Sequence, residues 1–321
     1  MHKAKELLEL IDDYLKAQRF DRKPRNLYSP FYYILDLPAK RLRPLLVLMA
    51  AEMFGVPPKK ALPVATAVEL FHNFTLIHDD IMDHAPIRRG KPTVHKKFGE
   101  ATAVLAGDAM LVYAYQYLRM APLEQVPALL KTFNDCAIDV CEGQQLDMNF
   151  ETNRQVRVKD YIEMIGLKTA ALLATSLRLG AQLGRVPDSA LNHLTAFGRE
   201  LGIAFQLKDD WLDAFGETNK LGKQRGGDIL QKKKTILILE AIRLSGAKEA
   251  THLWKLYNSS GKNKVDTVLK QFESIGLRES TLKMIEQRFE DAYMHLQLVD
   301  VPPKHKAPVM ELVGDLVGRD H

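Results

Sequence analysis

Cysteine is scarce in this sequence, and long apolar runs are missing. Among 321 residues only Cys136 and Cys141 are cysteines, too few for a disulfide framework, which favours a reducing compartment. No stretch reaches the roughly 18 to 20 uncharged apolar residues that a membrane-spanning helix needs, and the first residues form no apolar signal core. We therefore expect a cytoplasmic protein without a transmembrane segment.

A large excess of one charge is also missing. The chain carries 45 Lys+Arg and 40 Asp+Glu residues, a formal net charge of +5. A nucleic-acid-binding protein usually gathers its basic residues on one element with interleaved aromatic side chains. Here the basic residues form short, separate groups, each of a size that suits one phosphate group. These groups are 40–43, 88–91, 220–225 and 232–234. The distribution argues against nucleic acid as a partner.

Helical periodicity is abundant. Apolar residues make up 46% of the chain, enough for a sizeable core, and they return every three or four positions. Strand-like alternation is nearly absent, and no break is long or polar enough to be an interdomain linker. We expect a single all-α domain over residues 1–321 with ten or more helices packed around one another. The clearest expected helices cover 4–20, 45–54, 61–82, 101–119, 126–150, 158–183, 189–215 and 235–244.

Two of these helices carry the same acidic pattern. The motifs consist of Asp79, Asp80 and Asp83 in one helix and of Asp209, Asp210 and Asp213 in the other. Residues four apart lie on one face of a helix, so the carboxylates crowd together and repel one another unless cations neutralise them. Clusters of oxygen ligands suit Mg²⁺, which takes one or two carboxylates together with water and substrate phosphate.

Zinc is an alternative at the first motif. Its ligands would be His78, Asp79, Asp83 and His84, although the excess of carboxylates favours magnesium. Arg88 and Arg89 follow in a turn-forming stretch, and guanidinium groups bind phosphate oxygens in bidentate fashion. Carboxylates that hold metal ions, surrounded by cationic side chains, are what a diphosphate ester requires.

On these residues the chain resembles the trans-isoprenyl diphosphate synthases, the family of farnesyl, geranylgeranyl and longer-chain polyprenyl diphosphate synthases. The resemblance covers almost the whole chain. It rests on KRLRP at 40–44, LIHDDIMD at 76–83 with RRG at 88–90, GLKT at 166–169, FQLKDDWLD at 205–213, GK at 222–223 and KKT at 233–235.

The resemblance implies the isoprenoid synthase fold, a single large helical bundle around a central cavity, and usually a homodimer. It implies a prenyltransferase that binds three Mg²⁺ ions per active site. The substrates are isopentenyl diphosphate and an allylic diphosphate, which is dimethylallyl, geranyl or farnesyl diphosphate. Departure of the allylic diphosphate leaves a carbocation, the double bond of isopentenyl diphosphate attacks it, and a proton is then lost.

The resemblance also implies roles for individual residues. Asp79, Asp83 and Asp209 correspond to direct magnesium ligands, and Asp80, Asp210 and Asp213 to supporting ones. The allylic diphosphate would be held by Arg88, Lys168, Lys223 and Lys233. Isopentenyl diphosphate would be held by Lys40, Arg43, His72 and Arg89. The dipoles of Thr169 and Gln206 would face the cation. These ten residues and the six aspartates form the expected site.

Product length is expected to depend on bulk just before the first acidic motif, where the family places a floor for the growing chain. Here Phe74 lies five residues before Asp79, with the small Thr75 beside it. An ideal helix puts Phe74 about 140° from Asp79, so the resemblance and not the helical wheel selects it. No two-residue insertion interrupts the motif. We expect a product of fifteen or twenty carbons, with geranylgeranyl diphosphate favoured and farnesyl diphosphate next.

Two positions depart from the family pattern. Ala39 stands where the family usually has glycine, and Lys232 where it often has glycine. Alanine has less access to positive φ than glycine, so we expect the loop that carries Lys40 to be set slightly differently, without loss of the site.

Two other classes share some of these features. Terpene cyclases have the same helical fold and the first acidic motif, but they usually carry an Asn/Ser/Glu motif in place of the second and lack the pair Lys40 and Arg43. A non-catalytic regulatory subunit of a prenyl synthase typically loses an acidic motif. This chain keeps both motifs and the basic pair, which favours the prenyltransferase.

Overall fold

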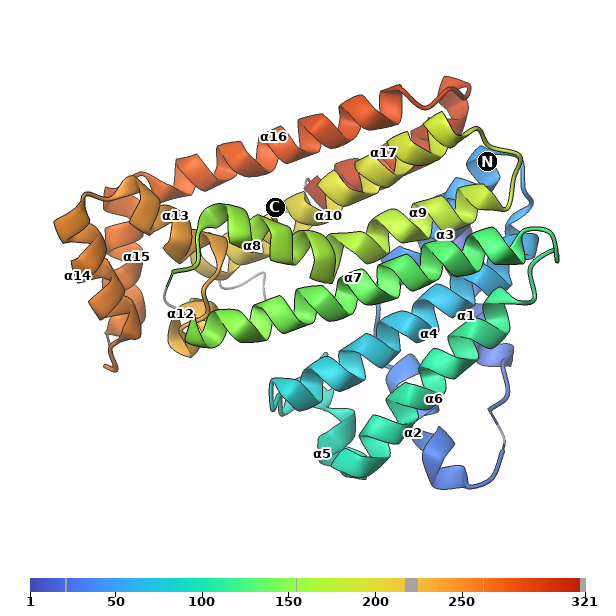
Figure 1. The fold of residues 1–321 in the computed structure, drawn as a ribbon, viewed down its shortest axis with the longest axis horizontal. Helices are drawn as coiled ribbons and strands as arrows, with labels where there is room; N and C mark the ends of the chain where they lie inside the picture. The colour runs from blue at the N-terminus through green and yellow to red at the C-terminus, as the bar shows by residue number, and fades with distance from the viewer. Residues whose placement is uncertain (21, 154, 217–224, 262, 318–321) are drawn as a thin grey trace. The chain divides into compact units, whose positions relative to one another are not determined.

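The computed structural model describes residues 1–20, 22–153, 155–216, 225–261 and 263–317. Helices account for nearly all regular structure in these ranges (Figure 1), and the expectation of an all-α fold with ten or more helices is confirmed. None of the helices in these ranges combines the length and the apolarity that crossing a bilayer requires.

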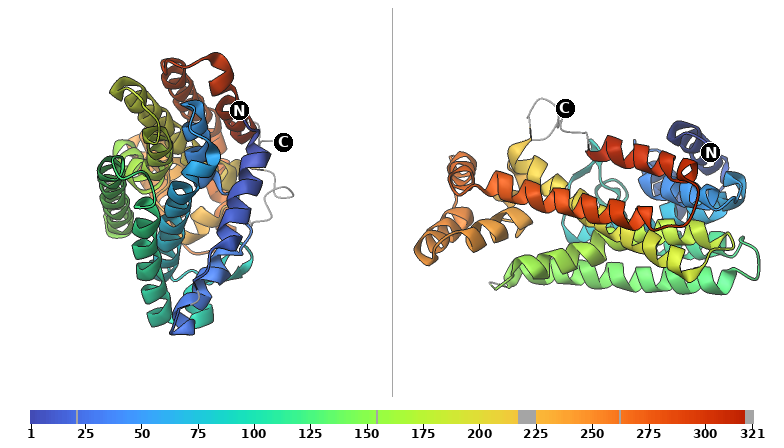
Figure 2. Two further views of the ribbon diagram at one scale, coloured as in Figure 1. Left: turned by 90° about the vertical axis from the view of Figure 1, so that its right-hand side faces the viewer. Right: turned by 90° about the horizontal axis from the view of Figure 1, so that it is seen from above.

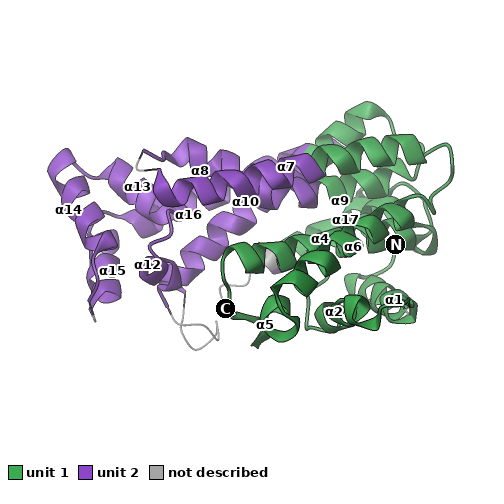
Figure 3. Cartoon of the chain, turned by 60° about the horizontal axis from the view of Figure 1, so that its bottom comes forward, with its two compact units in different colours: residues 1–136, 175–195, 299–314 green, residues 137–174, 196–298, 315–321 purple. Residues whose placement is uncertain are grey.

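The chain divides into two compact units (Figure 3). The first contains residues 1–136, 175–195 and 299–314, and the second contains residues 137–174, 196–298 and 315–321. The boundary falls within α7 (Val126–Thr152), α9 (Ala171–Gln182) and α10 (Asp188–Phe215), so each of these helices contributes to both units. A single domain over the whole chain stays a prediction.

The first unit has its core on α3 (Leu42–Met53) and α4 (Pro58–Met82). The seven side chains at 45–51 of α3 are each at most 1% exposed. A proline is well suited to the first position of a helix, and α4 begins with Pro58. α4 packs along α6, as Figures 1 and 2 show. The other elements of this unit are α1 (Ala4–Ala17), α2 (Arg25–Leu35), β1 (Ile87–Arg88), β2 (Lys91–Pro92), α5 (Val94–Phe98), α6 (Glu100–Leu118) and most of α17 (Pro303–Val317).

The second unit contains a feature that the periodicity did not predict. The expected helix 158–183 is interrupted by a π-helix, η1 (Gly166–Ala170), between α8 (Val158–Ile165) and α9. Glycines make room for it: a Cβ at Gly143 of α7 would lie 2.3 Å from the backbone nitrogen of Lys168, and one at Gly202 of α10 would lie 2.5 Å from Cα of Ala170. Single π-helical turns occur frequently at functional sites. The remaining elements of the unit are α12 (Gly227–Gln231), α13 (Ile236–Leu244), α14 (Ala247–Asn258), α15 (Lys264–Ser274) and α16 (Leu277–Gln297).

Candidate active site

The predicted site residues are distributed over both units. In the first unit the acidic motif stands at the carboxyl end of α4. The carboxylate of Asp80 is 1% exposed, and Nε of Arg88 donates to its two oxygens at 2.9 and 2.8 Å. The same guanidinium lies 3.5 Å from Oδ2 of Asp79. Asp79 is half-buried and Asp83 is exposed, so both are more exposed than Asp80.

A tight hairpin brings Arg88 back to the end of α4. Arg88 pairs with Lys91 across β1 and β2, and the two loop residues Arg89 and Gly90 both have positive φ, 52° and 75°. That combination defines a type I′ turn, the turn whose twist matches a two-residue hairpin loop. The turn explains how two adjacent arginines come to occupy different environments: Arg88 is half-buried on the acidic motif, and Arg89 is exposed.

Arg43 of α3 and His72 of α4 are adjacent. A terminal nitrogen of Arg43 lies 3.2 Å from Nε2 of His72. Burial lowers the pKa of Arg43 to about 10, so this guanidinium still carries its charge at neutral pH. Burial and the nearby Arg43 lower the pKa of His72 well below its usual value. The imidazole is therefore neutral, and its Nε2 can accept from Arg43. Lys40 is exposed.

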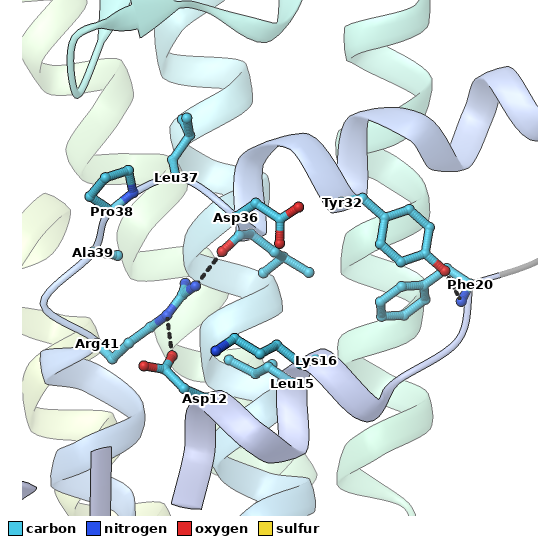
Figure 4. Close-up of a pocket in the computed structure, with 11 residues that line it drawn as sticks. Asp12, Leu15, Lys16, Phe20, Tyr32, Asp36, Leu37, Pro38, Ala39 and Arg41 are labelled. Atoms are coloured by element: carbon cyan, nitrogen blue, oxygen red, sulfur yellow. Dashed lines mark hydrogen bonds and ion pairs between the residues drawn. The ribbon is translucent and has the colours of Figure 1, made fainter. Parts of the chain in front are cut away.

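Arg41 anchors the loop between α2 and α3. Its side chain is 7% exposed and donates to Oε1 of Glu69 at 2.5 Å. It also donates to Oδ1 of Asp12 at 3.3 Å and to the carbonyl of Leu35 (Figure 4). Its backbone is left-handed, with φ 47° and ψ 33°. Ala39 is not among the residues with positive φ, so alanine in place of the family's glycine requires no left-handed backbone there.

A pocket of about 410 Å³ lies beside this loop. Figure 4 shows Ala39 and Arg41 among the residues that line it. The described residues that line it include none of the predicted site residues. The pocket is therefore not part of the candidate active site, although the two neighbours of Lys40 in the sequence line it.

In the second unit the acidic motif lies near the carboxyl end of α10. Asp210 is 4% exposed. The hydroxyl of Tyr161 donates to its Oδ2 at 2.5 Å, and Nε2 of Gln206 donates to its Oδ1 at 3.0 Å. Burial raises the pKa of Asp210 to about 7. Asp209, next to it, is exposed.

Asp213 holds the start of α12. Its carboxylate accepts from the backbone nitrogens of Gly227 at 3.2 Å and Asp228 at 3.1 Å. A carboxylate at a helix N-terminus is favoured by the unpaired N–H groups and by the helix dipole. In the second motif, as in the first, the middle aspartate is buried and bonded within its own unit, and the first aspartate is more exposed. Asp213 is bonded to the protein as well.

The π-helix η1 carries Lys168 and Thr169. Nζ of Lys168 lies 2.6 Å from Oδ2 of Asp147 on α7. The hydroxyl of Thr169 donates to Oε1 of Gln206 at 3.3 Å. Since Gln206 in turn donates to Asp210, both dipoles that the sequence assigned to the cation belong to one hydrogen-bonded chain.

The three consecutive lysines after α12 differ from one another. Lys232 ends the helix with φ 59°, which explains why glycine suits this position. Nζ of Lys234 donates to the backbone carbonyls of Phe150 and Glu151. Lys232 and Lys233 are both exposed, but only Lys232 has the left-handed backbone that ends the helix. The expected phosphate contact Lys223 lies outside the described residues.

The donor set of both motifs suits magnesium better than zinc. Nε2 of His78 lies 3.1 Å from the carbonyl of Val104, so a metal at the first motif would have to displace this contact. Throughout the described ranges no three His, Cys, Asp or Glu side chains are arranged to hold a metal by themselves. Mg²⁺ does not need such a cage, because it commonly binds through one or two carboxylates, with waters and substrate phosphates completing its shell. The aspartates of both motifs therefore fit Mg²⁺ as their metal.

Three residues of the site were missed by sequence reasoning: Arg41, Tyr161 and Asp147. Tyr161 is 49 positions from Asp210, and Asp147 is 21 positions from Lys168. A single sequence contains no signal for such pairs. Arg41 was visible within the basic group at 40–43, but nothing local distinguished a buried anchor from a ligand.

An all-α chain with two aspartate-rich motifs and basic residues grouped near them defines a polyprenyl synthetase. The model of the polyprenyl synthetase family matches residues 24–275, and the chain belongs to this family.

Individual relatives agree. A geranylgeranyl diphosphate synthase of Methanosarcina mazei is 43% identical over 233 residues, 72% of this chain and 71% of that one. A geranylfarnesyl diphosphate synthase of Natronomonas pharaonis is 38% identical over 251 residues, 73% of this chain and 74% of that one. A crystal structure of a geranylgeranyl pyrophosphate synthase superimposes with a TM-score of 0.95 at 41% identity and covers 99% of both chains. The expected isoprenoid synthase fold and the expected prenyltransferase class are confirmed.

Proposed function

We propose that this chain condenses isopentenyl diphosphate with an allylic diphosphate to give geranylgeranyl diphosphate, with farnesyl diphosphate as the next candidate. One observation carries the proposal at the level of residues. In each acidic motif the middle aspartate is buried and bonded within its own unit, Asp80 by Arg88 and Asp210 by Tyr161. The first aspartate of each motif, Asp79 or Asp209, is more accessible. A buried, bonded aspartate keeps each motif in place, and a more accessible aspartate beside it can bind a metal ion.

Asp79, Asp83 and Asp209 would hold Mg²⁺ directly, and the other three aspartates would support them. Three ions per active site are proposed from the family, as is the joint action of both motifs on one diphosphate. Bound magnesium would stabilise the negative charge of the departing diphosphate. Asp80 and Asp210 fix the position of the motifs: Arg88 neutralises Asp80, and the hydrogen bonds of Tyr161 and Gln206 orient Asp210.

The basic residues would bind the two diphosphates. Lys40, Arg43, His72 and Arg89 are proposed for isopentenyl diphosphate, and Arg88, Lys168, Lys223 and Lys233 for the allylic diphosphate. A neutral His72 can accept from Arg43 and hold that guanidinium in a fixed orientation. Thr169 and Gln206 would turn oxygen dipoles toward the allylic cation, and their mutual hydrogen bond limits how far either can rotate.

Product length is proposed to be limited by Phe74. Its ring is half-buried on α4, one turn before the acidic motif, and it contacts Phe71 and His78. Thr75 beside it is small, and its hydroxyl donates to the carbonyl of His72 at 2.8 Å, so it adds little bulk of its own.

The purified protein should be incubated with isopentenyl diphosphate, each allylic diphosphate in turn, and Mg²⁺, followed by dephosphorylation and chromatography of the prenyl alcohols. A twenty-carbon alcohol supports the proposal. Diphosphate release without isopentenyl diphosphate, giving a cyclic hydrocarbon, would identify a terpene cyclase. A regulatory subunit would give no turnover by itself, but it would change the product of an active prenyl synthase to which it is added.

A matched pair of variants tests the metal ligands. Asp79→Asn and Asp209→Asn should each remove turnover, while the exposed Asp135→Asn on α7 should leave it unchanged. Wild-type rates in both of the first two variants would refute the metal assignment.

A homodimer is proposed to form through α6. Leu105 and Val112 lie two turns apart on one face of this helix and are 60% and 56% exposed, an unusual placement for large apolar side chains that a second copy would cover. Leu105→Asp should give a monomer in light scattering. Leu123→Asp is the control, because Leu123 is 85% exposed but lies outside the helix. A cytoplasmic location remains part of the proposal on the sequence alone.

A further inference from the structure

The ring of Phe74 is held between aromatic neighbours on both sides. Toward the start of α4 its centroid is 5.6 Å from that of Phe71, at an interplanar angle of 51°. Toward the end of the helix it is 4.7 Å from the ring of His78, at 67°. Tilted and edge-to-face pairs at these separations are favourable beyond their buried area. Phe74 itself is half-buried, whereas Phe71 is 1% exposed.

Phe71 is supported in turn from two other helices. Its ring packs edge-on against Phe133 of α7 at 5.0 Å, and Phe133 packs edge-on against Tyr115 of α6 at 5.1 Å. Phe133 is 1% exposed. The hydroxyl of Tyr115 donates to Oδ1 of Asn134 at 2.7 Å, which fixes the outer end of the row. Protein interiors are packed closely enough that such a row transmits a displacement.

His78 is supported by the backbone of α6. Its Nε2 lies 3.1 Å from the carbonyl of Val104, and a Cβ at Gly107 would lie only 2.3 Å from the same nitrogen. The glycine thus provides the space into which the imidazole fits. Phe74 therefore cannot tilt toward either end of α4 without moving a ring that α6 or α7 holds.

We propose that Phe133 is a positioning residue for product length, acting through Phe71 on the ring of Phe74, with His78 as the stop on the opposite side. The inference rests on the proposed function, in which Phe74 forms the floor for the growing chain. A floor made of one half-buried ring on one helix would yield under a lengthening prenyl chain. The row of rings from α4 to α7 and α6 makes that ring rigid.

The test measures the distribution of products, which does not depend on how much of the enzyme is folded. Phe133→Ala should raise the ratio of products longer than twenty carbons to the twenty-carbon product by about threefold or more. A modest change in the relative rates of elongation and product release is enough for a shift of this size. Phe133→Leu keeps much of the volume and is the second variant in case Phe133→Ala does not fold. It should shift the ratio in the same direction, by less.

Two further variants separate the possible failures. Phe74→Ala tests the floor itself and should lengthen the product. Phe31→Leu is the matched control, because Phe31 is equally buried in the same unit and packs against Phe20, Tyr28 and Tyr113. It should leave the ratio unchanged.

If Phe74→Ala lengthens the product and neither Phe133 variant does, the positioning role is wrong and the floor stands. If Phe74→Ala has the wild-type profile, the floor is wrong and the inference falls with it. A shift in Phe31→Leu equal to that in Phe133→Leu would show that any buried cavity loosens the site, and it would also overturn the specific role of Phe133.

Discussion

Replacement of Arg41 by methionine should lower stability and the affinity for one substrate together. Arg41 and Glu69 are 7% and 2% exposed and their side chains lie 2.5 Å apart. Removing one partner of a buried ion pair leaves an uncompensated charge and costs about 3–5 kcal/mol. The contact to Asp12 adds less than about 1 kcal/mol, because Asp12 is 43% exposed and the 3.3 Å contact is screened. We expect Arg41→Met to reduce the free energy of unfolding by about 3–5 kcal/mol.

Urea unfolding of Arg41→Met, Glu69→Gln and the double variant measures the coupling directly. Glu69→Gln keeps Oε1 as an acceptor for Asn73, which donates to it at 2.9 Å, and removes only the charge. The double variant should be more stable than the sum of the single effects predicts, by about 1–3 kcal/mol. The exposed Arg119→Met is the control for loss of an arginine.

Because Lys40 and Arg43 flank Arg41, the KM for isopentenyl diphosphate should also rise, while the KM for the allylic substrate stays near wild type. Additive stability effects, together with a loss below about 1 kcal/mol in Arg41→Met, would refute this reasoning.

Three more predictions concern the second unit. Burial raises the pKa of Asp210 from 3.8 to about 7, so between these pH values the folded chain keeps a proton that the unfolded chain has released. Stability in metal-free buffer should therefore fall as the pH rises through this window, and Asp210→Asn should remove the fall. Gly143→Ala would place a methyl group 2.3 Å from the backbone of Lys168; it should lower both Tm and kcat, whereas Gly261→Ala, with nothing within 4 Å, should change neither. Lys233→Ala should raise the KM for the allylic diphosphate several-fold more than Lys232→Ala, and equal effects in a steady-state assay would contradict the distinction between the two lysines.

Much of the fold follows from apolar periodicity. The expected helices 61–82 and 126–150 appear as Pro58–Met82 and Val126–Thr152, because long runs in which apolar residues return every three or four positions leave few alternatives. The helices Leu277–Gln297 and Lys264–Ser274 were not among those predicted. Their buried residues are sparse, and polar or charged residues occupy most other positions, so their apolar stripes are weak.

The π-helix at Gly166–Ala170 could not be predicted from its own residues. The close approach that it makes to neighbouring helices is permitted by Gly143 and Gly202, which lie on two other helices. The same holds for the site. The motifs identified Asp80 and Asp210 as members of acidic clusters, but their partners come from a hairpin turn and from a tyrosine 49 positions away. Sequence spacing on one helix indicates which carboxylates lie together, and only the tertiary structure determines which of them the protein neutralises itself.

That neutralisation changes what metal binding must achieve. Crowded carboxylates destabilise a fold unless their charge is compensated, and the sequence alone leaves the whole of each motif to be compensated by metal. In the structure the protein itself compensates part of each motif: Arg88 pairs with Asp80 and also contacts Asp79, Tyr161 and Gln206 bond Asp210, and the start of α12 holds Asp213. Each of these contacts lies within one unit and involves no metal. The demand for cations is thereby reduced, and at the exposed Asp83 and Asp209 solvent also lowers the cost of charge. Chelation of Mg²⁺ should therefore stop turnover without unfolding either acidic motif, which separates the metal's proposed part in catalysis from the stability of the fold.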